Sequence, residues 1–216
     1  RYTVTRQDQD RFAFQSYLKT YKAIKNNYFK NELIKSPYKD EVRKDTTLVK
    51  LGQLKAVFKK FGTVTAGNAS SLNDGASFLA LASENYINSN KIKPIAKILS
   101  WASSAGNPDY MGVTPITAIQ KLMKKMGVNI GYFDLVEINE AFAATSVAVQ
   151  RSLKIDPNKL NIAGGAIALG HPIGCSGARI VTTLAHQLRR TKQKVGVASM
   201  CIGGGQGLAI AIEKLN

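Results

Sequence analysis

The fold can be worked out from one glycine-rich run, Gly164-Gly165-Ala166-Ile167-Ala168-Leu169-Gly170-His171-Pro172-Ile173-Gly174-Cys175-Ser176-Gly177-Ala178-Arg179. A second run follows it, Cys201-Ile202-Gly203-Gly204-Gly205-Gln206-Gly207. Together these runs hold both cysteines of the chain and one of its two histidines. Because glycine lets a ligand approach the backbone, scarce acid–base side chains placed among glycines indicate a reactive site rather than a core.

Around these runs the sequence alternates short apolar segments with amphipathic ones. We predict strands over residues 96–101, 135–138, 195–200 and 208–212, the last two joined by a turn at 203–207. Helices are expected from the Thr114-Pro115 cap to Gly127, from Asn139 to about Leu153, and from Ser176 onward. This alternation is typical of a layered α/β domain.

The amino-terminal part is less regular. Thr5 and Asp8 form a capping-box pattern before a helix that ends near Asn26. Its apolar face is expected to comprise Phe14, Tyr17, Leu18, Tyr21 and Ile24. Residues 32–61 are expected to be loop-rich, and Asn73 or Asp74 to open a helix that reaches about Tyr86.

Composition narrows the class of protein. The chain has 216 residues, 44% of them hydrophobic, and no apolar stretch of the roughly 18 residues needed to span a bilayer. Two cysteines cannot form a disulfide framework and fit a reducing compartment. The net charge of +16 is spread along the chain, and aromatic residues are few. We therefore expect a lysine-rich solvated surface, with no nucleic-acid or membrane partner. The alternatives are a surface that steers anions toward the protein and a basic nucleic-acid-binding module.

Three residues are candidates for chemistry, each with a structural alternative. His171 lies just before a predicted helix, where backbone N–H groups favour a neutral imidazole, although it could serve packing alone. Cys201 ends a predicted strand, where a small buried thiol is also common. Asn139 could be a site group or only a helix N-cap. We expect no metal site, because Pro172 and Gly174 break the helical geometry that would pair Cys175 with His171.

The runs Asn139-Glu140-Ala141-Phe142, Gly170-His171-Pro172-Ile173-Gly174 and Cys201-Ile202-Gly203-Gly204-Gly205, in this order and spacing, resemble the thiolase family, acetyl-CoA C-acetyltransferases in particular. Residues 62–70 and 73–76 match as well, so the resemblance covers the whole chain. It departs from the usual pattern at Cys175, where alanine is usual, and at Ser71, where glycine is common. The resemblance implies a thiolase-like layered αβα fold.

The resemblance also implies roles for individual residues. His171 would activate the nucleophile and, with a water held by Asn139, bind a thioester oxygen. Cys201 would be the acid–base that moves a proton at the acetyl methyl group, and the Gly203 N–H would serve a second oxyanion hole. Arg43, Ala66 and Ser70 would contact coenzyme A, while Met111 and Phe142 would line the acyl pocket. The substrates would be CoA thioesters, with no cofactor and no metal.

Thiolases have two similar α/β halves, and their acyl-accepting cysteine lies in the first. Neither Cys175 nor Cys201 matches that position. The resemblance therefore implies the remainder of a loop domain at 1–73, the last segment of the amino-terminal thiolase domain at 74–94, and a complete carboxy-terminal thiolase domain at 95–216. We expect this chain alone to be inactive.

The complete enzyme is expected to condense two acetyl-CoA reversibly to acetoacetyl-CoA and CoA, or to cleave short 3-ketoacyl-CoA. The alternatives are a long-chain 3-ketoacyl-CoA thiolase and a truncated, non-catalytic protein that binds CoA or a partner. A homo-dimer or homo-tetramer is expected. The expected compartment is intracellular, the cytoplasm, with the mitochondrial matrix as the alternative.

Overall fold

The structure is a computed structural model that describes residues 2–34, 36, 40 and 42–215. Its elements are, in chain order, α1 (Arg6–Lys25), α2 (Leu48–Gln53), α3 (Glu84–Ser89), β1 (Ala96–Ala105), the 3₁₀ helix η1 (Pro108–Val113), α4 (Thr114–Met126), the 3₁₀ helix η2 (Ile130–Tyr132), β2 (Leu135–Ile138), α5 (Ala143–Leu153), α6 (Ala166–Leu169), α7 (Ser176–Thr191), β3 (Val195–Ile202) and β4 (Gln206–Lys214). Within the described ranges, none of the helices combines the length and apolar content that crossing a bilayer requires.

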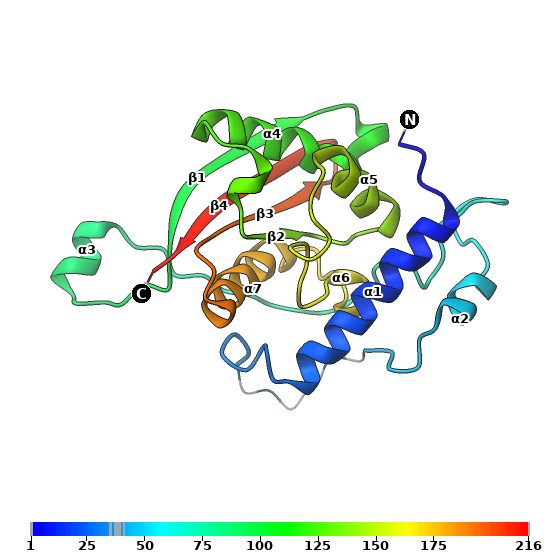
Figure 1. The fold of residues 1–216 in the computed structure, drawn as a ribbon, viewed down its shortest axis with the longest axis horizontal. Coiled ribbons are helices and arrows are strands. Elements are labelled where there is room, and N and C mark those ends of the chain that lie inside the picture. The colour runs from blue at the N-terminus through cyan, green and yellow to red at the C-terminus, as the bar shows by residue number, and fades with distance from the viewer. Residues whose placement is uncertain (1, 35, 37–39, 41, 216) are drawn as a thin grey trace.

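The four strands form one sheet with the order β1-β4-β3-β2. β4 runs antiparallel to both of its neighbours, whereas β2 runs parallel to β3. Helix α4 covers one face of the sheet and α7 the other (Figure 1). The layered α/β fold and its four strands are as predicted, although β1 continues to Ala105.

Helix α4 has the predicted length but a different start. Gly127 ends it in the left-handed region, at φ +67°, which glycine adopts without strain. Val113, not Thr114, occupies the N-cap, and no side chain caps the helix. The Thr114 hydroxyl instead lies 2.6 Å from the carbonyl oxygen of Gln206, at the start of β4. The predicted Thr114 cap is therefore wrong, because that side chain is used to fix the helix to the sheet.

Helix α1 forms as predicted, with the complete Thr5–Asp8 capping box and an end at Asn26. Its predicted apolar face is right at Tyr17, which is buried, and at Phe14, which is partly buried against the same cluster, but wrong at Leu18, Tyr21 and Ile24, which are exposed. The buried residues are mostly small or polar: Gln9, Asp10, Ala13, Ser16, Tyr17, Thr20 and Ala23. The reason is close packing, since a Cβ atom added to Gly164 would lie 2.7 Å from the Ser16 carbonyl oxygen. Small side chains let the helix approach the glycine-rich run.

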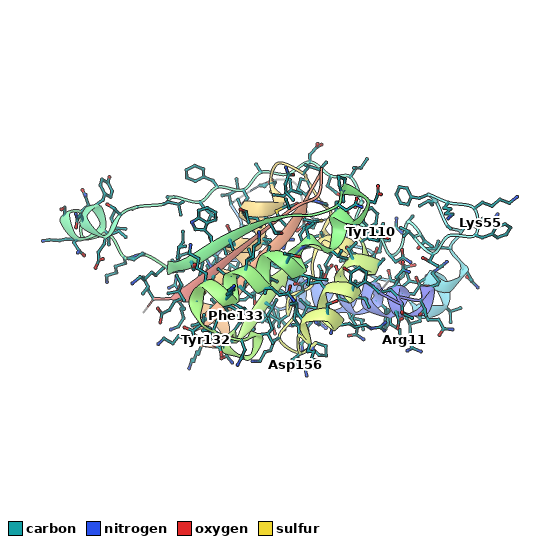
Figure 2. The ribbon with its side chains drawn as sticks, turned by 90° about the horizontal axis from the view of Figure 1, so that it is seen from above. Arg11, Lys55, Tyr110, Tyr132, Phe133 and Asp156 are labelled. Carbon is teal, nitrogen blue, oxygen red and sulfur yellow. The ribbon has the colours of Figure 1, made fainter. Side chains whose placement is uncertain are left out.

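The predicted helix from residue 73 to about 86 is absent. The chain is extended from Ser71 to Ser83, and only the short α3 follows. Its apolar side chains Leu72, Phe78 and Leu81 are 91%, 88% and 75% exposed. A short helix is stable mainly when its apolar face packs on something, and nothing in the described part of the chain covers this one. Helix α3 projects from one end of the molecule, as the stretch around Lys55 does from the other (Figures 1 and 2).

The loop-rich region at 32–61 is largely irregular, as predicted, with the short α2 as its one described helix. Thr47 caps α2, accepting a hydrogen bond from the N–H of Lys50. Residues 35, 37–39 and 41 of this region lie outside the described residues.

Candidate active site

Asn139 lies at the edge of the sheet where the parallel strands β2 and β3 end. It directly follows β2, and its backbone N–H donates to the Ser199 carbonyl oxygen at 3.0 Å. Because the two strands are parallel, this brings Asn139 beside the end of β3, where Cys201 lies two residues past Ser199. Helix α5 begins only at Ala143, with Phe142 as its N-cap. Asn139 therefore does not cap the helix and is free to act as a site group.

His171 is held in the loop between α6 and α7. Its Nε2 lies 3.1 Å from the Asn139 Nδ2, and its Nδ1 lies 2.6 Å from the Ser176 Oγ. Its backbone N–H donates to the Ser71 carbonyl oxygen. Burial lowers the pKa of His171, and the positive charge of Arg179 lowers it further. The imidazole is therefore neutral at pH 7, for these two reasons, and both of its nitrogens are engaged by polar side chains rather than by apolar packing.

Cys201 is half-buried near the end of β3. Burial raises the pKa of its thiol, so the resting side chain is protonated and can give up a proton. The following turn has Gly204 and Gly205 in the left-handed region, at φ +86° and +94°. A Cβ atom on Gly205 would lie 2.5 Å from the Gly106 carbonyl oxygen, so this turn packs closely on the start of η1. Gly203 itself is exposed, with open space around its Cα.

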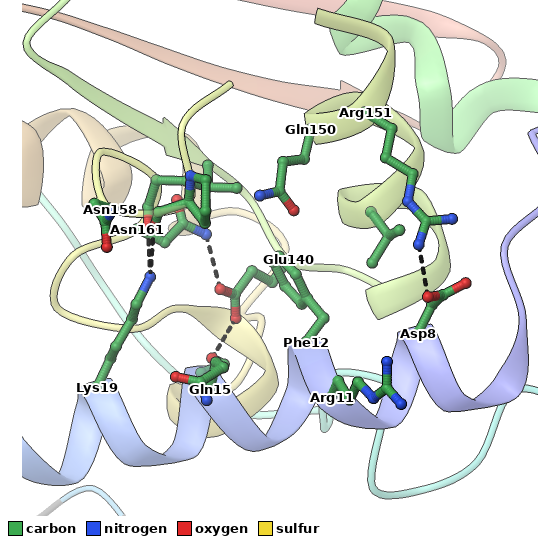
Figure 3. A pocket seen from close by; sticks show the side chains of 14 residues that line it. Asp8, Arg11, Phe12, Gln15, Lys19, Glu140, Gln150, Arg151, Asn158 and Asn161 are labelled. Carbon is green, nitrogen blue, oxygen red and sulfur yellow. Dashed lines mark hydrogen bonds and ion pairs between the residues drawn. The ribbon is translucent and has the colours of Figure 1, made fainter. Parts of the chain in front are cut away.

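Glu140 supports the loop that carries Asn139. The carboxylate is 1% exposed and accepts hydrogen bonds from Ser16 Oγ at 2.6 Å, Asn161 Nδ2 at 2.8 Å and the Ile167 backbone N–H at 3.2 Å. These donors come from α1, from a turn and from α6. Figure 3 shows Glu140 between α1 and the Asn158–Asn161 turn. The loop at 139–142 is thus tied to both flanking layers.

Two of the predicted ligand-binding residues lie against this loop. The Ser70 hydroxyl and backbone N–H both contact the Ala141 carbonyl oxygen at 3.0 Å. Phe142 pairs with Ala69 through a β-bridge, and its ring lies edge-on to that of Phe58 at 5.8 Å between centroids.

The other predicted ligand-binding residues are more exposed to solvent. Met111 is 43% exposed in η1, and the adjacent Gly112 packs on Thr145 of α5. Arg43 and Ala66 are exposed, and no hydrogen bond or ion pair among the described residues joins them to Asn139, His171 or Cys201. Within that same part of the chain, no three His, Cys, Asp or Glu side chains gather in a way that could hold a metal ion.

Sequence reasoning missed the residues that support this site: Ser16, Glu140, Asn161 and Ser176. The available signal was a glutamate two positions past the predicted strand at 135–138.

The chain matches two family models, described as the N-terminal domain of thiolase over residues 1–85 and the C-terminal domain of thiolase over residues 92–214. Among curated proteins, it is 43% identical to "3-ketoacyl-CoA thiolase, mitochondrial" of Rattus norvegicus over 99% of this chain and 56% of that protein. It is 44% identical to "Probable acetyl-CoA acetyltransferase" of Dictyostelium discoideum over 100% of this chain and 55% of that protein.

The solved structures that this chain resembles are also thiolases and acetyl-CoA acetyltransferases. The acetyl-CoA acetyltransferase of Bacillus anthracis superposes with a TM-score of 0.94 at 43% identity, covering 99% of this chain and 57% of that one. Human mitochondrial 3-ketoacyl-CoA thiolase in complex with CoA superposes with a TM-score of 0.91 at 41% identity, covering 99% and 56%. The chain thus spans about half the length of the relatives it matches.

Proposed function

The chain belongs to the thiolase family, and on that premise we propose that it supplies the acid–base part of an enzyme that transfers acetyl groups between CoA thioesters. The proposed reaction is the reversible condensation of two acetyl-CoA to acetoacetyl-CoA and CoA, or thiolysis of short 3-ketoacyl-CoA. The observation that carries it is the 3.1 Å contact between Asn139 Nδ2 and His171 Nε2, at the sheet edge where β3 delivers Cys201.

Each of these side chains has a protonation state that suits its proposed role. A neutral His171 can take the proton of a nucleophilic thiol at Nε2. The protonated Cys201 can return a proton to the departing enolate during thiolysis, and the thiolate that this leaves can remove a proton from an acetyl methyl group in the reverse direction. A thioester α-proton is only weakly acidic, so the enolate oxygen needs preorganised donors, each worth about 3–4 kcal/mol. The Gly203 N–H and the His171–Asn139 pair would supply them.

The remaining assignments follow from the family. Arg43, Ala66 and Ser70 would contact CoA, and Met111 and Phe142 would line the acyl pocket. The acyl-accepting cysteine would come from the half of the relatives that these 216 residues do not match, so the 216-residue chain by itself would not cleave acetoacetyl-CoA. The enzyme would be a homo-dimer or homo-tetramer in an intracellular compartment, the cytoplasm or the mitochondrial matrix.

A chimera tests the proposal. The part of the Bacillus anthracis acetyltransferase that precedes the matched region is joined to these 216 residues, and thiolysis of acetoacetyl-CoA is measured beside the 216-residue chain alone. We expect activity from the chimera only, a loss of roughly 100-fold or more in C201A, and little change in C175A, the matched control. A folded chimera that is inactive, or an active C201A variant, would overturn the proposal.

Relatives named 3-ketoacyl-CoA thiolase support a second candidate, an enzyme for long acyl chains. The same chimera separates the two, since faster turnover of a long 3-ketoacyl-CoA than of acetoacetyl-CoA would favour the second.

A further inference from the structure

We propose that Ser176 is a positioning residue for His171, whose hydroxyl holds the imidazole ring and governs which ring nitrogen carries the proton. This inference rests on the proposed function and deepens the role of His171 in it. Ser176 is the first residue of α7 and is 1% exposed. Its Oγ lies 2.6 Å from His171 Nδ1 and 3.0 Å from the Pro172 carbonyl oxygen. It does not cap α7, where Cys175 is the N-cap and no side-chain cap bond exists.

The hydrogen bonds define one complete arrangement. An amide NH₂ group only donates, so the Asn139 Nδ2 contact places a lone pair on His171 Nε2. The proton of the neutral ring is then on Nδ1, which donates to Ser176 Oγ, and the hydroxyl donates in turn to Pro172. Nε2 is the basic nitrogen in this arrangement, as it must be to take a proton from a thiol.

A second arrangement uses the same atoms. If the Asn139 amide turns over, its Oδ1 accepts from an Nε2–H, and Ser176 donates to Nδ1. Two observations indicate that this exchange costs little free energy. The Pro172 carbonyl oxygen already accepts the backbone N–H groups of Cys175 and Ser176, so it does not depend on the hydroxyl. The Asn139 Oδ1 is buried without a hydrogen-bond partner among the described residues, so no other bond fixes the amide.

The choice of a hydroxyl at this position has a chemical consequence. A hydroxyl both donates and accepts, whereas a carboxylate beside Nδ1 would only accept and would hold the proton there. With Ser176, the ring can present Nε2 as a base toward a thiol and as an N–H donor toward a thioester oxygen without moving. The proposed reaction needs both states of Nε2.

Nitrogen NMR of the 216-residue chain tests this without any catalytic readout. The chain has two histidines, so H186Q leaves His171 as the single labelled ring. In that background, S176A should change the balance between the Nδ1–H and Nε2–H tautomers and lower the pKa of His171 further, because the Nδ1–H of the imidazolium loses its acceptor. Arg179, the charged side chain whose field acts on the ring, is kept in every variant.

The outcome that overturns the proposal is a folded S176A chain with the tautomer balance and the pKa of its H186Q parent. If S176A does not fold, S176C replaces it, since a thiol is of similar size but bonds weakly, and the same changes are required.

The activity of the chimera provides a second test of the role of Ser176. S176A should lower kcat/KM roughly 10- to 100-fold and shift its pH profile, with S176T restoring most of the activity, as expected for a residue that orients a reacting group. An unchanged kcat/KM and pH profile in S176A would contradict the proposal. An inactive parent chimera would instead contradict the proposed function, while the NMR result would still decide the role of Ser176.

Discussion

Two regions of this molecule are rich in apolar residues, but the side chains of one are buried and those of the other are exposed. Between α7 and the sheet, Leu184 and Leu188 are 0% exposed, while in the extended stretch at 72–83 Leu72 and Phe78 are 91% and 88% exposed. The first region has a second layer of the same chain against it. In the second, the described residues form no such layer over Leu72 and Phe78, although Gly75 lies against Pro172. An apolar pattern thus becomes structure only where a covering surface exists. Asn139 and Cys201 lie on the covered side, whereas His171 also bonds through its backbone N–H to Ser71, where the extended stretch begins.

The largest expected effect comes from a matched pair of leucines. L184A should destabilise the chain by about 4 kcal/mol, because it removes a fully buried side chain and leaves a cavity. L81A, at a side chain that is 75% exposed, should change stability by about 0.5 kcal/mol or less. Urea unfolding measures both. Equal effects would mean that the stretch at 72–83 is as well packed as α7.

A pair of glutamates sharpens the contrast at the site. E140A should destabilise the chain by about 3 kcal/mol, since Ser16, Asn161 and the Ile167 N–H lose a buried acceptor. E84A, in the exposed first turn of α3, is the control and should be nearly neutral. Thermal unfolding of the two variants gives the comparison, and a neutral E140A would contradict the supporting role of that carboxylate.

The pH dependence of stability should report on Glu137, a buried residue of β2. Burial raises its pKa to about 8, against the opposing charge of Arg179. The folded chain therefore keeps a proton that the unfolded chain releases above about pH 4.5, so stability falls as the pH rises toward 8. Between about pH 5.5 and 7.5 we expect a loss of about 2.5 kcal/mol that E137Q lacks. Parallel profiles for the two proteins would refute this origin.

The smallest effect is expected in the uncovered stretch. Replacing Leu72, Phe78 and Leu81 together by serine should change the free energy of unfolding by about 0.5 kcal/mol or less while reducing the binding of a hydrophobic dye. Light scattering should show less self-association of the variant. A large loss of stability would show that these side chains pack against the chain after all.

The same contrast explains what the sequence could predict. The strands and the helices α4 and α7 were predictable because their apolar periodicity is satisfied by layers within the chain. The prediction of a helix at 73–86 was wrong because no layer of the described chain covers its apolar face. The predicted buried face of α1 was right only at Phe14 and Tyr17, because the close approach to Gly164 selects small side chains over large apolar ones.

Within the site, a glycine-rich run before a predicted helix pointed to His171, and the ends of two predicted strands pointed to Asn139 and Cys201. Their supporting contacts were beyond sequence patterns, since Ser16 and Glu140 are 124 residues apart in the chain and meet only through the packing of α1. Ser176 is five residues from His171, but only the loop geometry shows that its hydroxyl faces the ring and does not cap α7.

The central claim is that the layers around β2, β3 and α7 hold the Asn139–His171 pair together without a contribution from the exposed apolar side chains of the stretch at 72–83. Hydrogen–deuterium exchange of the 216-residue chain, read by mass spectrometry, tests it most directly. Peptides from Val195–Ile202 and the peptide containing the Asn139 N–H, which donates to Ser199, should be protected, while peptides within 72–83 should exchange at the earliest time point. Equal protection of the two regions, or rapid exchange at Asn139, would contradict the claim.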